Sequence, residues 1–262
     1  MEQKKIVKEV GLYFILTFLI TWLLWLPSVL NAMDYQVPVF LLIISMMASF
    51  TPSIVGLILL KRSLGDQFKV HLKERFSLRF NKLWLFIIPI YFFATGGLSY
   101  YLTYVFDQGF NPTNVPPVWM VPLVFLQILF IGGAFGEELG WRGFAYPRMV
   151  KLMSPFKTTL LLGALWSLWH LPLFFMENTV QSNLPMYQFM LQNTLITFIY
   201  TWLYQNSKGS LWLIIYLHAI ANTTAAVLPY WQSNTGRWIN FIILLITVIV
   251  LQFANKKEIP QN

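Results

Sequence analysis

Long apolar runs recur along the whole chain and leave little room for a water-soluble fold. Each run has about 18 or more apolar residues, which is enough to cross the hydrocarbon core of a bilayer as a helix. Only 11% of the 262 residues are charged, whereas soluble domains carry about a quarter. The sequence therefore predicts an all-α fold, a polytopic membrane helix bundle.

We predict about eight transmembrane helices in a single integral membrane domain, residues 1–262. The predicted spans are residues 10–31, 37–60, 83–105, 118–142, 157–176, 186–205, 210–229 and 237–254. The first apolar run resembles the core of a signal peptide. Its length, from Val10 to Leu30, favours an uncleaved first span instead.

The distribution of basic residues predicts the orientation. With eight spans and an inner N-terminus, all of the 18 Lys and Arg residues except Arg237 fall on the inner side. Because cytoplasmic loops are enriched in Lys and Arg, we expect a multi-pass cell-membrane protein with both termini cytoplasmic. The net charge of +8 is then explained by basic cytoplasmic loops that face the membrane lipids. We therefore expect no nucleic-acid partner.

The longest inner loop, residues 61–82, carries apolar residues at steps of four with basic residues between them. The apolar residues are Leu64, Phe68, Leu72, Phe76 and Phe80. This pattern predicts a basic amphipathic helix that lies on the anionic inner leaflet.

Two carboxylates and a guanidinium stand together in an apolar segment, in the sequence GEELGWR. Glu138 and Arg142 are spaced i, i+4, so they lie on one helix face and can form an ion pair. Glu137 lies about 100° around the helix from Glu138. The spacing therefore predicts one structural carboxylate and one that is available for chemistry.

Glycines repeat every four residues on the same predicted helix, at Gly132, Gly136 and Gly140. A stripe of small residues lets a neighbouring helix approach closely. We expect this stripe to hold the charged turn inside the bundle.

Two later spans carry one histidine each. Trp166 lies one turn before His170, and Pro172 predicts a kink directly after it. In the seventh span, His218 and Asn222 share a face at i, i+4. Because polar groups in lipid lack water as a partner, both histidines are candidates for a functional site.

These motifs, on three separate membrane helices, resemble the family of CAAX proteases and bacteriocin-processing proteins, also called CPBP or Abi. The matching residues are Glu137-Glu138…Arg142, Trp166…His170 and His218…Asn222. The resemblance covers roughly residues 118–229, which we take as the catalytic core. One departure is Trp166, because the family usually has Phe at that position.

The resemblance implies an intramembrane endopeptidase that acts on a lipidated or membrane-inserted peptide near the cytoplasmic leaflet. We expect Glu137 to act as general base on a water molecule that His170 helps to hold. His218 and the Asn222 amide would donate hydrogen bonds to the oxyanion.

The remaining motif residues are expected to support this site. Glu138 and Arg142 would hold the helix turn in register, and Trp166 would form an aromatic wall. We favour a mechanism without a metal cofactor. The alternative is a catalytic zinc ion bound by Glu137, His170 and His218, although the chain has no HExxH motif.

Other mechanisms and functions stay open at the level of sequence. The chain has no cysteine, and Ser167 lies on a different helix face from His170, so neither a cysteine nor a serine nucleophile is expected. One alternative function is a transporter with an intramembrane charge relay. Another is a non-catalytic peptide-binding or immunity protein that keeps the same fold.

Overall fold

The computed structural model describes residues 2–131 and 133–255, in which every regular element is helical. The α-helices are α1 (Glu2–Ala32), α2 (Val39–Met46), α3 (Thr51–Leu64), α4 (Phe68–Arg75), α5 (Trp84–Phe106), α6 (Val121–Phe130), α7 (Ala134–Gly140), α8 (Tyr146–Met149), α9 (Pro155–Trp169), α10 (Met186–Asn206), α11 (Leu211–Val227) and α12 (Asn234–Asn255). Short turns of other helix types are η1 (Met47–Phe50), η2 (Gly65–Gln67), η3 (Val118–Met120), η4 (Trp141–Ala145), η5 (Leu171–Phe175), η6 (Gln181–Asn183) and η7 (Tyr230–Gln232).

Six helical segments of the described ranges are long and apolar enough to cross a membrane. They begin with α1, α2, α5, η3, α9 and α12. α11 is a shorter apolar helix of 17 residues, and α10 has 21 residues with more polar side chains. The prediction of an all-α polytopic bundle is confirmed, and these six segments together with α10 and α11 overlap the eight predicted spans.

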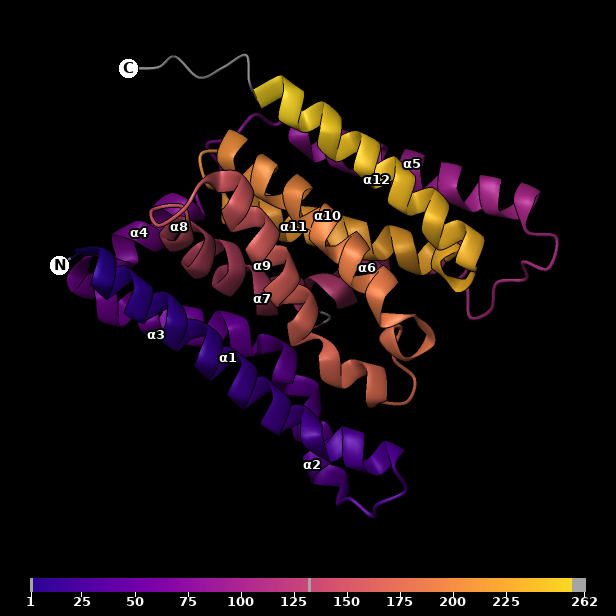
Figure 1. The fold of residues 1–262 in the computed structure, drawn as a ribbon, viewed down its shortest axis with the longest axis horizontal. Coiled ribbons are helices and arrows are strands. Elements are labelled where there is room, and N and C mark those ends of the chain that lie inside the picture. The colour runs from indigo at the N-terminus through magenta and orange to yellow at the C-terminus, as the bar shows by residue number, and fades with distance from the viewer. Residues whose placement is uncertain (1, 132, 256–262) are drawn as a thin grey trace.

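The helices form three groups that position the charged motif at the centre (Figure 1). α1, α2 and α3 cover one flank, while α5 and α12 cover the other. α7 lies between them and packs on both α3 and α11, and α9 packs along α10. The residues of α7 are therefore enclosed by protein on several sides.

The fourth predicted span is not one continuous helix. α6 ends at Phe130 and α7 begins at Ala134. Between them Gly133 has φ +112°, a conformation that residues with a side chain rarely adopt. The prediction of a single helix over residues 118–142 is wrong here, because this glycine turns the chain just before the charged motif.

The loop over residues 61–82 also differs from its prediction. It is helical only as far as Arg75, in the last turn of α3, in η2 and in α4. Its five regularly spaced apolar residues pack against the protein core instead of facing lipid. Phe76, for example, contacts the ring of Trp212 on α11 with centroids 5.3 Å apart. The predicted leaflet-bound helix is therefore wrong, and we call residues 65–82 the inner strap.

The loops that were assigned to the inner side meet at one end of the bundle. Arg148 donates to the Glu9 carboxylate at 2.8 Å, and the Ser63 hydroxyl donates to the same carboxylate at 3.1 Å. Arg75 donates to the main-chain oxygen of Lys208 at 3.4 Å. These contacts join α1, α3, α8, the inner strap and the turn between α10 and α11.

The opposite end gathers segments that were assigned to the outer side. The Ser233 hydroxyl donates to Asp107 at 2.5 Å, which joins the start of α12 to the end of α5. α1 begins and α12 ends on the same side of the bundle, at the left of Figure 1. Lys256 and Lys257 lie outside the described residues.

This arrangement makes the predicted orientation testable. We expect a reporter fused after Lys82 to lie in the cytoplasm and one fused after Pro116 to lie on the outer side, because the basic loops are retained inside. Paired phosphatase and fluorescent-protein fusions in cells would measure both positions. If the two fusions report the same side, the eight-span orientation is incorrect.

Candidate active site

Close helix contacts hold α7 inside the bundle. A Cβ atom at Gly136 would lie 2.6 Å from the carbonyl oxygen of Ser49, and one at Gly140 would collide with the carbonyl of Pro52. Both positions therefore require glycine for α3 and η1 to approach. Gly132 lies outside the described residues, so the predicted stripe is confirmed only at Gly136 and Gly140.

Glu138 and Arg142 form the predicted ion pair. The Nη1 atom of Arg142 lies 3.0 and 3.1 Å from the two carboxylate oxygens of Glu138, and both side chains are 0% exposed. His218 joins the pair from α11, because its Nδ1 lies 2.8 Å from Oε1 of Glu138. One buried carboxylate thus holds a guanidinium and an imidazole together.

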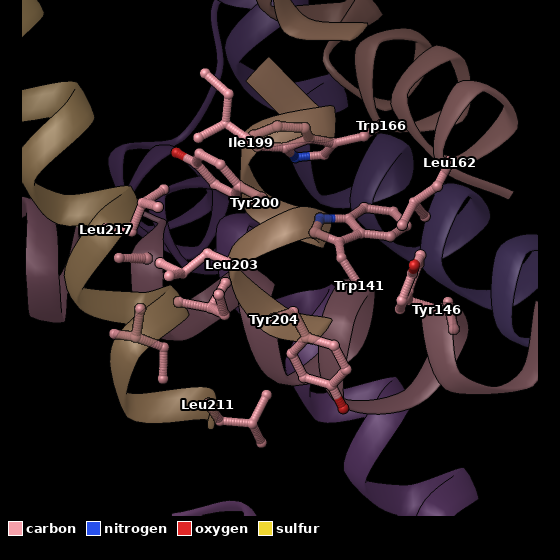
Figure 2. Close-up of a cluster of buried hydrophobic side chains, with 14 of the residues drawn as sticks. Trp141, Tyr146, Leu162, Trp166, Ile199, Tyr200, Leu203, Tyr204, Leu211 and Leu217 are labelled. Atoms are coloured by element: carbon pink, nitrogen blue, oxygen red, sulfur yellow. The ribbon is translucent and has the colours of Figure 1, made fainter. Parts of the chain in front are cut away.

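The Glu137 side chain turns away from this pair, as its position on the helix predicted. Its Oε2 accepts hydrogen bonds from the indole nitrogens of Trp166 at 2.5 Å and Trp141 at 3.4 Å. Figure 2 shows these two indoles close together, with their nitrogens toward the same region. Within the described residues, no hydrogen bond reaches Oε1 of Glu137, and the residue is 5% exposed.

Trp166 has a role that was not expected from sequence. We expected an aromatic wall, which Phe would also provide. The indole N–H adds a donor that Phe lacks, and this donor fixes one oxygen of Glu137. The departure from the family motif therefore changes how the proposed base is held.

His170 lies at the end of α9, where Pro172 stops the regular helix and η5 begins. Its Nδ1 is 2.7 Å from the main-chain oxygen of Trp166. Since a carbonyl can only accept, Nδ1 carries the proton and Nε2 is the acceptor of a neutral ring. Trp166 therefore contacts Glu137 through its indole and His170 through its backbone.

Two aromatic rings complete the surroundings of Arg142. Its guanidinium carbon lies 4.7 Å from the ring centroids of both Trp166 and Tyr200. The Nε and Nη2 atoms of Arg142 are buried without a hydrogen-bond partner among the described residues. The ring faces supply attraction to the cation instead.

Tyr200 is the residue that sequence reasoning missed. It is buried on α10 and its ring lies 5.6 Å from that of His218 and 5.7 Å from that of Trp166, as Figure 2 illustrates for the tryptophan. No spacing or motif on α10 points to it, because its importance depends on neighbours from three other elements.

Asn222 lies one turn beyond His218, and among the described residues it forms no hydrogen bond with the buried charge cluster. Its side chain is exposed and lines a cavity of about 380 Å³. Asn193 and Phe189 line the same cavity, and the Phe189 ring lies 5.2 Å from that of His170. The cavity therefore approaches the site from the side of His170 and Asn222.

The donor set expected for zinc does not form a metal cluster. In the part of the chain that the structure describes, no group of three or more His, Asp or Glu side chains is arranged to hold a metal ion. This includes Glu137, His170 and His218.

The fold and site define a multi-pass helical membrane protein that buries a polar cluster where α7, α9, α10 and α11 meet. Residues 117–224 match the family model described as Type II CAAX prenyl endopeptidase Rce1-like. The chain is also 28% identical over 259 residues to "CAAX prenyl protease 2" of Methanococcus maripaludis, covering 92% of each chain. These matches confirm the resemblance to the CAAX protease family that the motifs indicated. The matched family and the matched protein are both described as peptidases.

Proposed function

We propose that this chain is an intramembrane endopeptidase in which Glu137 activates the water that attacks the peptide bond. The observation that carries the proposal is the asymmetric environment of Glu137. Two indole N–H groups hold one carboxylate oxygen, while the other oxygen has no protein donor among the described residues. A carboxylate fixed in this way can accept a proton from water at a defined atom.

The proposed reaction begins with proton transfer from water to Glu137 as the water oxygen adds to the substrate carbonyl carbon. Nε2 of His170 accepts the second hydrogen bond of this water and orients it. When the tetrahedral intermediate collapses, the C–N bond breaks and Glu137 returns the proton to the leaving amine. No metal ion takes part in this scheme.

The second histidine is assigned to the oxyanion. The Glu138 carboxylate lies 2.8 Å from Nδ1 of His218 and orients the ring, and Nε2 of this ring would donate to the oxyanion. The Asn222 amide, which faces the cavity, would provide a further donor. Arg142 pairs with both oxygens of Glu138 and holds this carboxylate in place.

The substrate is proposed to be a prenylated or otherwise membrane-inserted peptide that reaches the site from the bilayer. This assignment is supported by the names of the similar proteins, which refer to CAAX prenyl substrates. We expect cleavage near the cytoplasmic leaflet, and this expectation is supported by the short path from α7 through η4 and α8 to the basic end of the bundle.

The first test is cleavage of a prenylated peptide by the purified chain in detergent. We expect mass spectrometry to detect cleavage at one peptide bond. Turnover should not change after extensive chelation of metal ions, because all the proposed catalytic groups are side chains. A chain that binds the peptide without cutting it would favour the non-catalytic alternative. Loss of activity on chelation, restored by zinc alone, would contradict the metal-free scheme.

A second test concerns the ring face of Tyr200. Tyr200→Leu is expected to lower kcat about tenfold, with little change in KM, because the cation–π contact with Arg142 is lost. Tyr200→Phe keeps the ring and should restore turnover. Kinetics with the same peptide would measure both variants.

Tyr204→Leu is the matched control, since Tyr204 is also buried on α10 but packs on Tyr146 and Arg75. If Tyr204→Leu lowers kcat as much as Tyr200→Leu, the effect reflects general packing, and the contact of Tyr200 with Arg142 has no specific part in turnover.

A further inference from the structure

The inner strap leaves its basic face directed away from the core. Its apolar residues pack against the bundle. Its charged residues therefore do not belong to an amphipathic helix whose apolar face is inserted in lipid. Lys73 and Arg79 are exposed on the strap, and Lys208 is exposed in the turn between α10 and α11. The three cations thus come from two segments that lie far apart in the chain.

The three cations line one pocket. It has a volume of about 450 Å³, and Ser77, Ser207 and Glu74 also contribute to its wall. Within the described residues, none of the three cations forms an ion pair with a carboxylate. The pocket therefore combines three cations that form no ion pair among the described residues with one carboxylate and with hydroxyl groups.

The walls of this pocket are fixed to each other. Arg75 donates to the carbonyl of Lys208 and contacts the ring of Tyr204 at 5.9 Å. Gly209 has φ +71°, and a Cβ atom there would collide with the Arg75 guanidinium. The backbone segments that carry the three cations are thus joined to each other, so an anion can bind without ordering the backbone first.

We propose that this pocket binds a phosphate group, carried either by an anionic phospholipid or by a small soluble phosphate. A phosphate offers several acceptor oxygens and up to two negative charges, which match three cations and neighbouring hydroxyls. In the predicted orientation the pocket opens at the cytoplasmic face, where anionic headgroups are concentrated. The site is separate from the buried cluster and does not depend on the proposed peptidase activity.

The experiment uses the full chain in detergent and isothermal titration calorimetry with three probes. Dioctanoyl phosphatidic acid presents a lipid phosphate, inorganic phosphate presents the free group, and dioctanoyl phosphatidylcholine has no net charge. The Lys73→Gln, Arg79→Gln, Lys208→Gln triple variant should bind phosphatidic acid at least about tenfold more weakly than the wild type. If the variant also binds inorganic phosphate more weakly, the free phosphate group is sufficient for binding to the pocket. If only the binding of phosphatidic acid is weakened, the ligand is the phosphate of a lipid headgroup.

A second triple variant controls for general attraction. Lys61→Gln, Arg62→Gln and Lys151→Gln remove the same charge from exposed positions that do not line the pocket. This variant should bind within about threefold of the wild type, because surface charges at a distance are screened by salt. Lys208→Gln alone leaves the strap intact and should also weaken binding. Equal weakening by both triple variants, or no binding of either phosphate probe to the wild type, would overturn the proposal.

Discussion

Glu137→Gln is expected to reduce peptidase activity by about 10²–10⁴-fold while leaving thermal stability unchanged. Glutamine has the same shape, and its amide oxygen can still accept from the indoles of Trp141 and Trp166. It cannot take a proton from water, so the proposed base is lost. Turnover of a prenylated peptide and thermal unfolding in detergent would measure the two effects separately.

The matched control is the same substitution at Glu177, an exposed residue outside the cluster. Glu177→Gln should retain full activity. A Glu137→Gln enzyme that stays within tenfold of the wild type would show that another group activates the water.

Removing either partner of the Glu138–Arg142 pair is expected to destabilise the protein by about 3–5 kcal/mol. Both side chains are 0% exposed, so the remaining charge has no access to water. Glu138→Ala would in addition leave His218 without its acceptor. The thermal midpoint should fall on the order of 10 °C, together with loss of activity.

The chain offers an exposed pair with the same i, i+4 spacing as a comparison. Lys5 lies 3.9 Å from Glu9, and its side chain is 67% exposed. Lys5→Ala should change the free energy of unfolding by no more than about 1 kcal/mol, because water screens such pairs. If Arg142→Ala is as stable as Lys5→Ala, the buried pair does not support the fold.

The sequence predicted the fold class and the local part of the site. Apolar runs of membrane-crossing length identify helices because a bilayer satisfies no backbone polar group, and six helical segments of the described residues are long and apolar enough to cross it. The pairing of Glu138 with Arg142, and the different direction of Glu137, follow from helix geometry over four residues. The motif residues on α9 and α11 were recognised from spacing and resemblance.

Long-range contacts decided the rest. The Glu137 carboxylate is held by Trp166, 29 residues away, and Glu138 accepts from His218, 80 residues away. Tyr200 meets Arg142 only because α10 passes beside η4. Periodicity within one helix contains no information on which face of another helix it will meet.

The two wrong predictions have the same origin. The inner strap has the periodicity of a leaflet-bound helix, but the aromatic surface around Trp212 on α11 was available to cover its apolar side chains. The fourth span is uniformly apolar, but the turn at Gly133 allows α7 to pack between α3 and α11. An apolar pattern determines that side chains leave water, whereas only the tertiary structure decides whether lipid or protein receives them.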